Sequence, residues 1–169
     1  AGSYTYTTGT TTTVYNSGVV YATGATTTIT SNQGVVNVTG HSAVITTNSS
    51  TVNVTGNTAT VTTNEGTVNV TGYSVTVVDS QGQTNITGYT SAITNSGNVY
   101  VTGYTSTITN MATTYVTGYV SNITGGTNYI TGTTINTTDG TNYITGDSIG
   151  VTNGTNTITV TGTTYPVLI

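Results

Sequence analysis

Thr51-Val52-Asn53-Val54-Thr55-Gly56-Asn57-Thr58-Ala59-Thr60-Val61-Thr62 is the stretch that decides the fold. On each side of Gly56, apolar and polar residues alternate with a period of two, which predicts a β-strand with one buried face. The alternation changes phase across Thr55-Gly56. The chain is therefore expected to bend there, since glycine permits the backbone angles that a corner needs.

The same unit recurs along the whole chain, every 14 to 16 residues. Its marker is a Thr-Gly dipeptide, whose glycines are Gly9, Gly24, Gly40, Gly56, Gly72, Gly88, Gly103, Gly118, Gly132, Gly146 and Gly162. The length varies at a second corner, where turn residues stand, such as Asn-Glu-Gly (64–66) and Asp-Gly (139–140). Two strands and two corners per repeat predict one coil of a two-sided, all-β solenoid with about eleven coils, which forms a single domain over residues 1–169. The alternative is an antiparallel sandwich or barrel, which would not require the same residue types in the same columns.

Three columns of residues predict the core. Two residues before each glycine stand Ala22, Val38, Val54, Val70, Ile86, Val101, Val116, Ile130, Ile144 and Val160. Five residues after it stand Val14, Ile29, Ile45, Val61, Val77, Ile93, Ile108, Ile123, Thr137, Val151 and Val167. Three residues after it stand smaller side chains, namely Ala43, Ala59, Val75, Ser91, Ser106, Ser121 and Ile135.

Composition excludes several classes of partner. The chain has no Lys, Arg or Cys, a net charge of −4, and 2% charged residues, against about 25% in a typical soluble domain. Nucleic acids and anionic lipids are excluded as partners because both require cationic side chains. No apolar run approaches the roughly 18 residues of a membrane span. Because no apolar leader is present and the chain begins with Ala1, we expect a processed, secreted protein.

The titratable side chains do not form a catalytic or metal-binding pattern. His41 stands at a corner with no carboxylate within a few residues to orient it, as a general base requires. Glu65 and Asp79 share the variable corner of adjacent coils and Asp139 and Asp147 stand at opposite corners, whereas calcium needs six to eight oxygens. We expect no enzyme activity, no cofactor and no metal.

Outward positions form ladders of like residues. After the glycine, positions two, four and six give a Thr-x-Thr-x-Thr face, complete at Thr58, Thr60 and Thr62 and at Thr105, Thr107 and Thr109. A column three residues before the glycine reads Tyr6, Tyr21, Asn37, Asn53, Asn69, Asn85, Tyr100, Tyr115, Tyr129 and Tyr143. Another column directly after the glycine contains Tyr73, Tyr89, Tyr104 and Tyr119. Stacked Thr, Asn and aromatic side chains stabilise sheets by themselves, so a purely structural role is one interpretation.

The Thr-x-Thr face resembles that of insect ice-binding solenoids, and Asn-Tyr-Ile-Thr-Gly (128–132 and 142–146) resembles the Asn-x-Val-x-Gly repeat of the ryegrass ice-binding protein. This resemblance implies ordering of ice-like water on a flat threonine array. Val44, Ala92, Asn122, Asn136 and Gly150 interrupt the middle threonine column. The composition is similar to that of archaeal surface and filament proteins, which implies an extracellular structural role with glycosylation.

Eight asparagines open Asn-x-Ser/Thr sequons and are candidate glycosylation sites: Asn37, Asn48, Asn53, Asn69, Asn85, Asn122, Asn136 and Asn153. Four of them share one column at strand spacing, where neighbouring glycans would crowd each other. The corner residues Asn48 and Asn153 are therefore expected to be the more accessible candidates.

The sequence favours a subunit of an extracellular filament or cell-surface fibre that joins copies of itself head to tail. The expected assembly interface comprises Tyr4 and Tyr6 at one end and Tyr165, Val167, Leu168 and Ile169 at the other, where burial of the apolar side chains would drive association. An ice-binding protein is the second hypothesis. The third is a glycan-binding adhesin, because aromatic faces in the tyrosine columns suit sugar rings.

Overall fold

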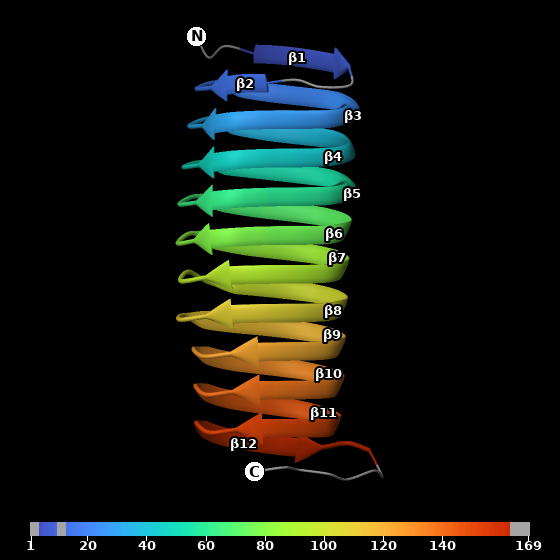
Figure 1. Cartoon of the computed structure of the whole chain (residues 1–169), viewed down its shortest axis with the longest axis vertical. Coiled ribbons are helices and arrows are strands. Elements are labelled where there is room, and N and C mark those ends of the chain that lie inside the picture. The colour runs from blue at the N-terminus through green and yellow to red at the C-terminus, as the bar shows by residue number, and fades with distance from the viewer. Residues whose placement is uncertain (1–3, 10–12, 163–169) are drawn as a thin grey trace.

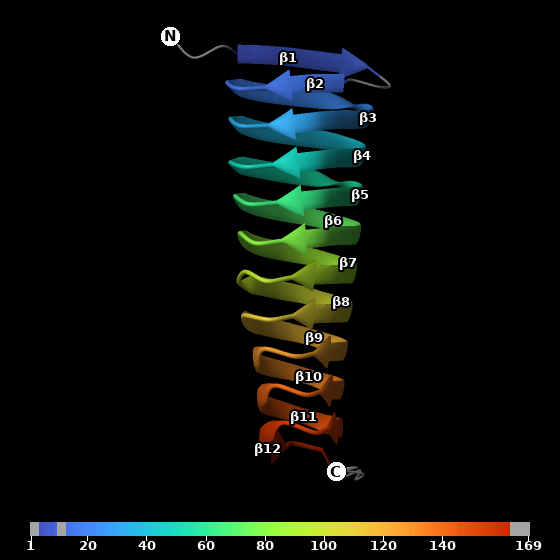
Figure 2. The ribbon, with the colours of Figure 1, turned by 60° about the vertical axis from the view of Figure 1, so that its left-hand side comes forward.

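A computed structural model describes residues 4–9 and 13–162, which are built from β-strands and short turns. The strands are β1 (Tyr4–Gly9), β2 (Thr13–Asn16), β3 (Val19–Asn32), β4 (Val35–Asn48), β5 (Thr51–Asn64), β6 (Thr67–Ser80), β7 (Gln83–Asn95), β8 (Val99–Asn110), β9 (Thr113–Thr124), β10 (Thr127–Thr138), β11 (Thr141–Thr152) and β12 (Thr155–Val160). Figures 1 and 2 show them from two sides, stacked along one axis as a rod.

All of the strands belong to one sheet with parallel pairing, in the order β1-β3-β4-β5-β6-β7-β8-β9-β10-β11-β12, and β2 pairs with β3. The described residues make about ten turns, against the eleven coils expected from the sequence. The predicted all-β solenoid is confirmed. The antiparallel alternative is wrong, because each strand pairs in parallel with the next coil.

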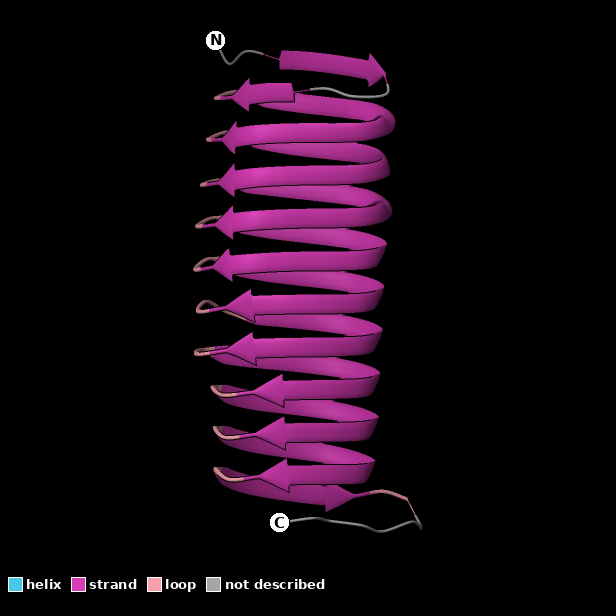
Figure 3. Ribbon diagram, in the orientation of Figure 1, coloured by secondary structure: helices cyan, strands magenta, loops and turns pink. Residues whose placement is uncertain are grey.

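The two corners of a coil are built differently. Each strand from β3 to β11 runs through its Thr-Gly dipeptide without a break and bends back there, whereas consecutive strands are joined by short turns on the opposite side (Figures 1 and 3). The turns hold Asp139 and Asn153, both with a φ of 59°, and Asp79 has a φ of 51° near the end of β6, where the pairing with β7 is irregular. Register pairs the corner glycines from Gly9 to Gly146 in succession, so the variation in coil length lies away from this corner. Part of it is in the turns, as predicted, and part is at the pairing irregularities between Val14 and Tyr15 and between Val77 and Ser80.

The reason for the corner glycine differs from the expected one. None of the glycines from Gly24 to Gly146 in the Thr-Gly positions has a positive φ. A Cβ on Gly24 would instead lie 1.9 Å from the carbonyl oxygen of Gly9, and one on Gly56 would lie 2.2 Å from that of Gly40. Glycine is required because successive backbones approach too closely at the bend to leave room for a side chain.

Buried columns fill the interior between the two sides of each coil. The described apolar residues of the three predicted columns are buried, from Ala22 and Ile29 to Ile144 and Val151, with Val160 as the exception. A fourth column, four residues before each corner glycine, was missed and includes Val20, Val36, Val52, Val68 and Val99. Each fully buried Val or Ile contributes about 1.5–3 kcal/mol, so neighbour stacking stabilises coils that are too small to fold alone.

The last coil follows a different register from the predicted one. Val160 was expected in the core, two residues before Gly162, but it pairs with Gly146 and so occupies the corner-glycine position. Ile158 pairs with Ile144 and takes the core column instead. Strand β12 ends at Val160.

A buried asparagine ladder closes the turn side of the coils. Asn16, Asn32, Asn48 and Asn64 end successive strands, and each Nδ2 donates to the next Oδ1 at 2.7 Å, up to Asn64. The same oxygens accept backbone N–H groups two residues on, as in Ser50 N–H to Asn48 Oδ1 at 3.2 Å. Farther along, Asn128, Asn142 and Asn156 form a second ladder at the start of the strands. These amides satisfy buried backbone groups of the turns as well as one another.

Candidate functional surfaces

The longest uniform feature of the surface is a row of threonines directly before the corner glycines. It is an unbroken row of eleven residues and almost wholly exposed: Thr8, Thr23, Thr39, Thr55, Thr71, Thr87, Thr102, Thr117, Thr131, Thr145 and Thr159. Parallel in-register pairing spaces these hydroxyls at about 4.8 Å. The row is therefore a regular line of small polar groups along the rod.

The Thr-x-Thr-x-Thr face is less regular than this row. Its six candidate residues are exposed or half-buried, in β5 for Thr58, Thr60 and Thr62 and in β8 for Thr105, Thr107 and Thr109. The structure does not bring the two triplets together, because β6 and β7 lie between them. In those strands Val78 and Ala92 interrupt the face, and Val78 is 44% exposed. Only isolated coils present the full triplet.

The column three residues before the glycine is part asparagine and part tyrosine. The asparagines are half-buried, and Asn53, Asn69 and Asn85 each donate to the preceding asparagine at 2.7–2.9 Å. Tyr100, Tyr115, Tyr129 and Tyr143 then stack with ring centroids 4.9–5.0 Å apart. Their ring faces cover one another, so this column presents mainly ring edges and hydroxyls to solvent.

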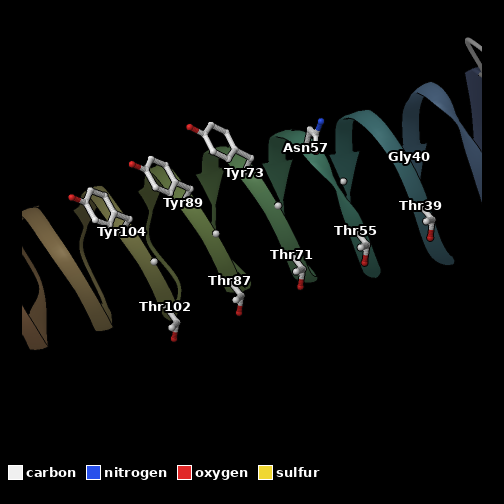
Figure 4. A pocket seen from close by; sticks show the side chains of 14 residues that line it. Thr39, Gly40, Thr55, Asn57, Thr71, Tyr73, Thr87, Tyr89, Thr102 and Tyr104 are labelled. Carbon is white, nitrogen blue, oxygen red and sulfur yellow. The ribbon is translucent and has the colours of Figure 1, made fainter.

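A second tyrosine stack stands directly after the corner glycines. Tyr73, Tyr89, Tyr104 and Tyr119 stack at 4.8–4.9 Å with interplanar angles of 2–8°. An open trough of about 920 Å³ runs beside this stack, with the corner glycines from Gly40 to Gly103 and the threonine row lining it (Figure 4). The trough extends along the rod over five coils, and the tyrosine stack occupies four, three of which it shares with the trough.

The sequon asparagines differ widely in accessibility. Asn48 was expected to be accessible, but it is fully buried in the turn ladder, so that expectation is wrong. Asn153 is exposed in its turn, and Asn136 is exposed on the flat face with its Nδ2 donating to Asn122 at 2.9 Å. In Asn53, Asn69 and Asn85, the side-chain nitrogen that a glycan would modify donates a hydrogen bond to the preceding asparagine of the column. Asn153 is the sequon that the fold leaves most open.

The predicted assembly residues are only partly within the described structure. Tyr4 and Tyr6 lie on β1, 65% and 74% exposed, and Tyr6 stacks on Tyr21 at 5.2 Å. Tyr165, Val167, Leu168 and Ile169 lie outside the described residues. β1 and β12 are the terminal strands of the sheet, and within residues 4–9 and 13–162 no element pairs with their outer edges.

The titratable groups remain scattered. His41, Glu65, Asp79 and Asp139 are exposed, and Asp147 accepts a hydrogen bond from Thr161 Oγ1 at 2.6 Å. Over the described ranges no three His, Cys, Asp or Glu side chains gather into a possible metal site. The same ranges contain no helix of the length and apolarity that crossing a bilayer requires.

Comparisons with protein-family models, with curated protein sequences and with solved structures find no match to this chain.

Proposed function

We propose that this chain is a structural subunit of an extracellular filament or cell-surface fibre, in which copies stack head to tail through the edges of β1 and β12. The observation that supports it most is the pairing of the sheet. Every coil adds to the preceding one by the same parallel register, and the described residues leave the backbone groups at both sheet edges unpaired. Unprotected edges of this kind are templates for another strand.

The two edges are compatible in sequence. Continuing the register would set Asn156 of one copy next to Thr5 of another, in the column four residues before the glycine. A threonine and an asparagine are already neighbours in this column inside the solenoid, where Thr114 pairs with Asn128. Because the contact joins unlike ends, it continues without limit unless it closes a ring.

The surface is consistent with an extracellular location. It is rich in threonine, asparagine and tyrosine, and the chain has 2% charged residues, a composition that resembles that of surface and filament proteins. Asn153 supplies an exposed sequon for a covalent glycan. The proposal includes no catalytic step, metal or cofactor.

A charge at the stacking edge tests the proposal. Thr5 is exposed on β1 and would become buried when another copy stacks, so Thr5→Lys should leave a folded monomer. Thr107→Lys adds the same charge at an exposed site in the middle of the rod and should still form filaments. Light scattering and negative-stain microscopy follow the assembly. A wild-type chain that stays monomeric at high concentration contradicts the proposal.

Ice binding is the second candidate, because the unbroken threonine row gives a regular hydroxyl array along the whole rod. It requires a gap between melting and freezing points at micromolar protein. If a gap is observed, Thr87→Tyr and Thr107→Tyr distinguish the corner row from the interrupted flat face. Absence of both the gap and ice-crystal shaping removes this candidate.

A further inference from the structure

The tyrosine stack beside the trough ends abruptly at Tyr73. One face of the Tyr73 ring lies on Tyr89, at 4.9 Å and 3°. The other face is directed toward the neighbouring coil, where Asn57 occupies the same position (Figure 4). Tyr73 is 61% exposed, against 44–47% for Tyr89, Tyr104 and Tyr119. Tyr73 therefore ends the stack on the side of the trough with an open ring face, whereas Tyr119 ends it at the other side, away from the residues that line the trough.

The space beside Asn57 is as long, along the rod, as the spacing between two stacked tyrosine rings. Coils repeat at about 4.8 Å, and the tyrosines of the stack are 4.8–4.9 Å apart. The shorter Asn57 side chain therefore leaves a gap of one ring where a fifth tyrosine would stand. The gap opens into the trough, because Asn57, Thr55 and Gly56 line it together with Tyr73.

The chemistry of this gap is that of a site for a neutral, hydroxylated ring. The negative face of an aromatic ring attracts partially positive C–H groups, and the amide of Asn57 offers two donors and an acceptor at the rim. None of the fourteen residues that line the trough is charged, and threonine hydroxyls line it beside the glycines. A pyranose has an apolar C–H face and peripheral hydroxyls, which match both features.

We propose that Tyr73 and Asn57 form a binding site for a terminal neutral pyranose, which stacks on the free face of Tyr73 and takes the place of the missing ring. The site is independent of filament assembly, since it lies on the side of the rod in β5 and β6. The tyrosines inside the stack do not contribute such sites, because both of their faces are covered.

The test is a titration of the full chain with the methyl glycosides of glucose, galactose and mannose, followed through the ring proton resonances of the tyrosines. We expect at least one glycoside to shift Tyr73 with a dissociation constant on the order of millimolar, as suits a single small ring. The rings of Tyr104 and Tyr115, with both faces stacked, should not respond.

Two substitutions of the exposed Asn57 test the geometry without changing the core. Asn57→Ala removes the amide and keeps the ring face open, so binding should weaken about tenfold, as expected for the loss of about one hydrogen bond. Asn57→Tyr extends the stack and covers Tyr73, so Tyr73 should stop responding to the sugar.

Three results would overturn the proposal. One is a response of Tyr104 or Tyr115 equal to that of Tyr73. Another is binding of a planar aromatic such as phenol at Tyr73 with no response to any of the glycosides. The third is a Tyr73 shift that depends on protein concentration without sugar, which would show that a second copy of the chain fills the gap.

Discussion

Nδ2 of Asn32 donates to Oδ1 of Asn48 across 2.7 Å, and both side chains are completely buried at the turn side of the coils. Nδ2 of Asn48 donates in the same way to Oδ1 of Asn64, and it also donates to the carbonyl oxygen of Ser50 at 2.9 Å. Each amide thus closes its own turn and joins it to the next coil. A row of buried polar groups is stable here because it is almost fully hydrogen-bonded.

Replacing Asn48 with alanine should therefore be strongly destabilising. It leaves one N–H of the Asn32 amide and the oxygen of Asn64 without a partner in the interior, at about 1–3 kcal/mol for each unsatisfied group, whereas Asn32 Nδ2 keeps its bond to the carbonyl oxygen of Thr51 at 3.3 Å. Urea unfolding should show a loss of about 2–5 kcal/mol. Asn136→Ala, on the exposed face, is the matched control and should change stability by less than about 0.5 kcal/mol. Equal effects of the two substitutions would contradict the importance of the ladder.

The corner glycines give a second prediction. A Cβ at position 56 would lie 2.2 Å from the carbonyl oxygen of Gly40, so Gly56→Ala forces two coils apart. We expect a loss of at least about 2 kcal/mol in the free energy of unfolding. Gly150→Ala is the control, because its Cβ would meet only the Oδ1 end of the exposed Asn136 side chain, at 2.8 Å, which can move away. Tolerance of Gly56→Ala would show that the close approach of the backbones is relaxed at the bend.

The sequence predicts the coil well because every coil requires a glycine at the same corner. Each corner glycine between Gly24 and Gly146 lies close to the backbone of the preceding coil, so the same requirement for glycine recurs once per coil and the coils can be counted from the sequence. The final coil was misplaced because Gly162 completed a Thr-Gly pair by chance. The segment Asn156-Thr157-Ile158-Thr159 matches Asn142-Tyr143-Ile144-Thr145 and gives the correct register, with Ile158 in the core.

The asparagine ladder was missed because polarity was interpreted as exposure. Asn48 is a turn residue within a sequon, and both features suggested an accessible side chain. The recurrence of asparagine every 16 residues at Asn16, Asn32, Asn48 and Asn64 was the available signal. The open face of Tyr73 required the structure, because a column shows which rings are neighbours but not how they stack or where a face stays free.

Three buried serines give a stabilising prediction. Ser91, Ser106 and Ser121 follow Ala43, Ala59 and Val75 in the small-residue column, and their hydroxyl oxygens have no hydrogen-bond partner. Ser106→Ala removes an unpaired buried polar atom and fits where alanine already fits in other coils. It should raise the free energy of unfolding by about 1 kcal/mol. A loss of stability would indicate that an internal water binds the hydroxyl.

Resistance to chymotrypsin tests the strand pairing of the whole rod. The chain has no Lys or Arg for trypsin, whereas the rings of Tyr100 and Tyr115 are 39% and 41% exposed to a protease that prefers tyrosine. Their backbone is paired on both sides, within β8 and β9, so cleavage there requires local or global unfolding. We expect the native protein to lose no fragment at these positions under conditions that digest it completely in urea above its unfolding midpoint. The native cleavage rate should also rise in Asn48→Ala, by up to about tenfold for each 1.4 kcal/mol of lost stability, since cleavage follows the population of the open state. Rapid native cleavage after Tyr100 or Tyr115 would show that these strands are not held in the register described.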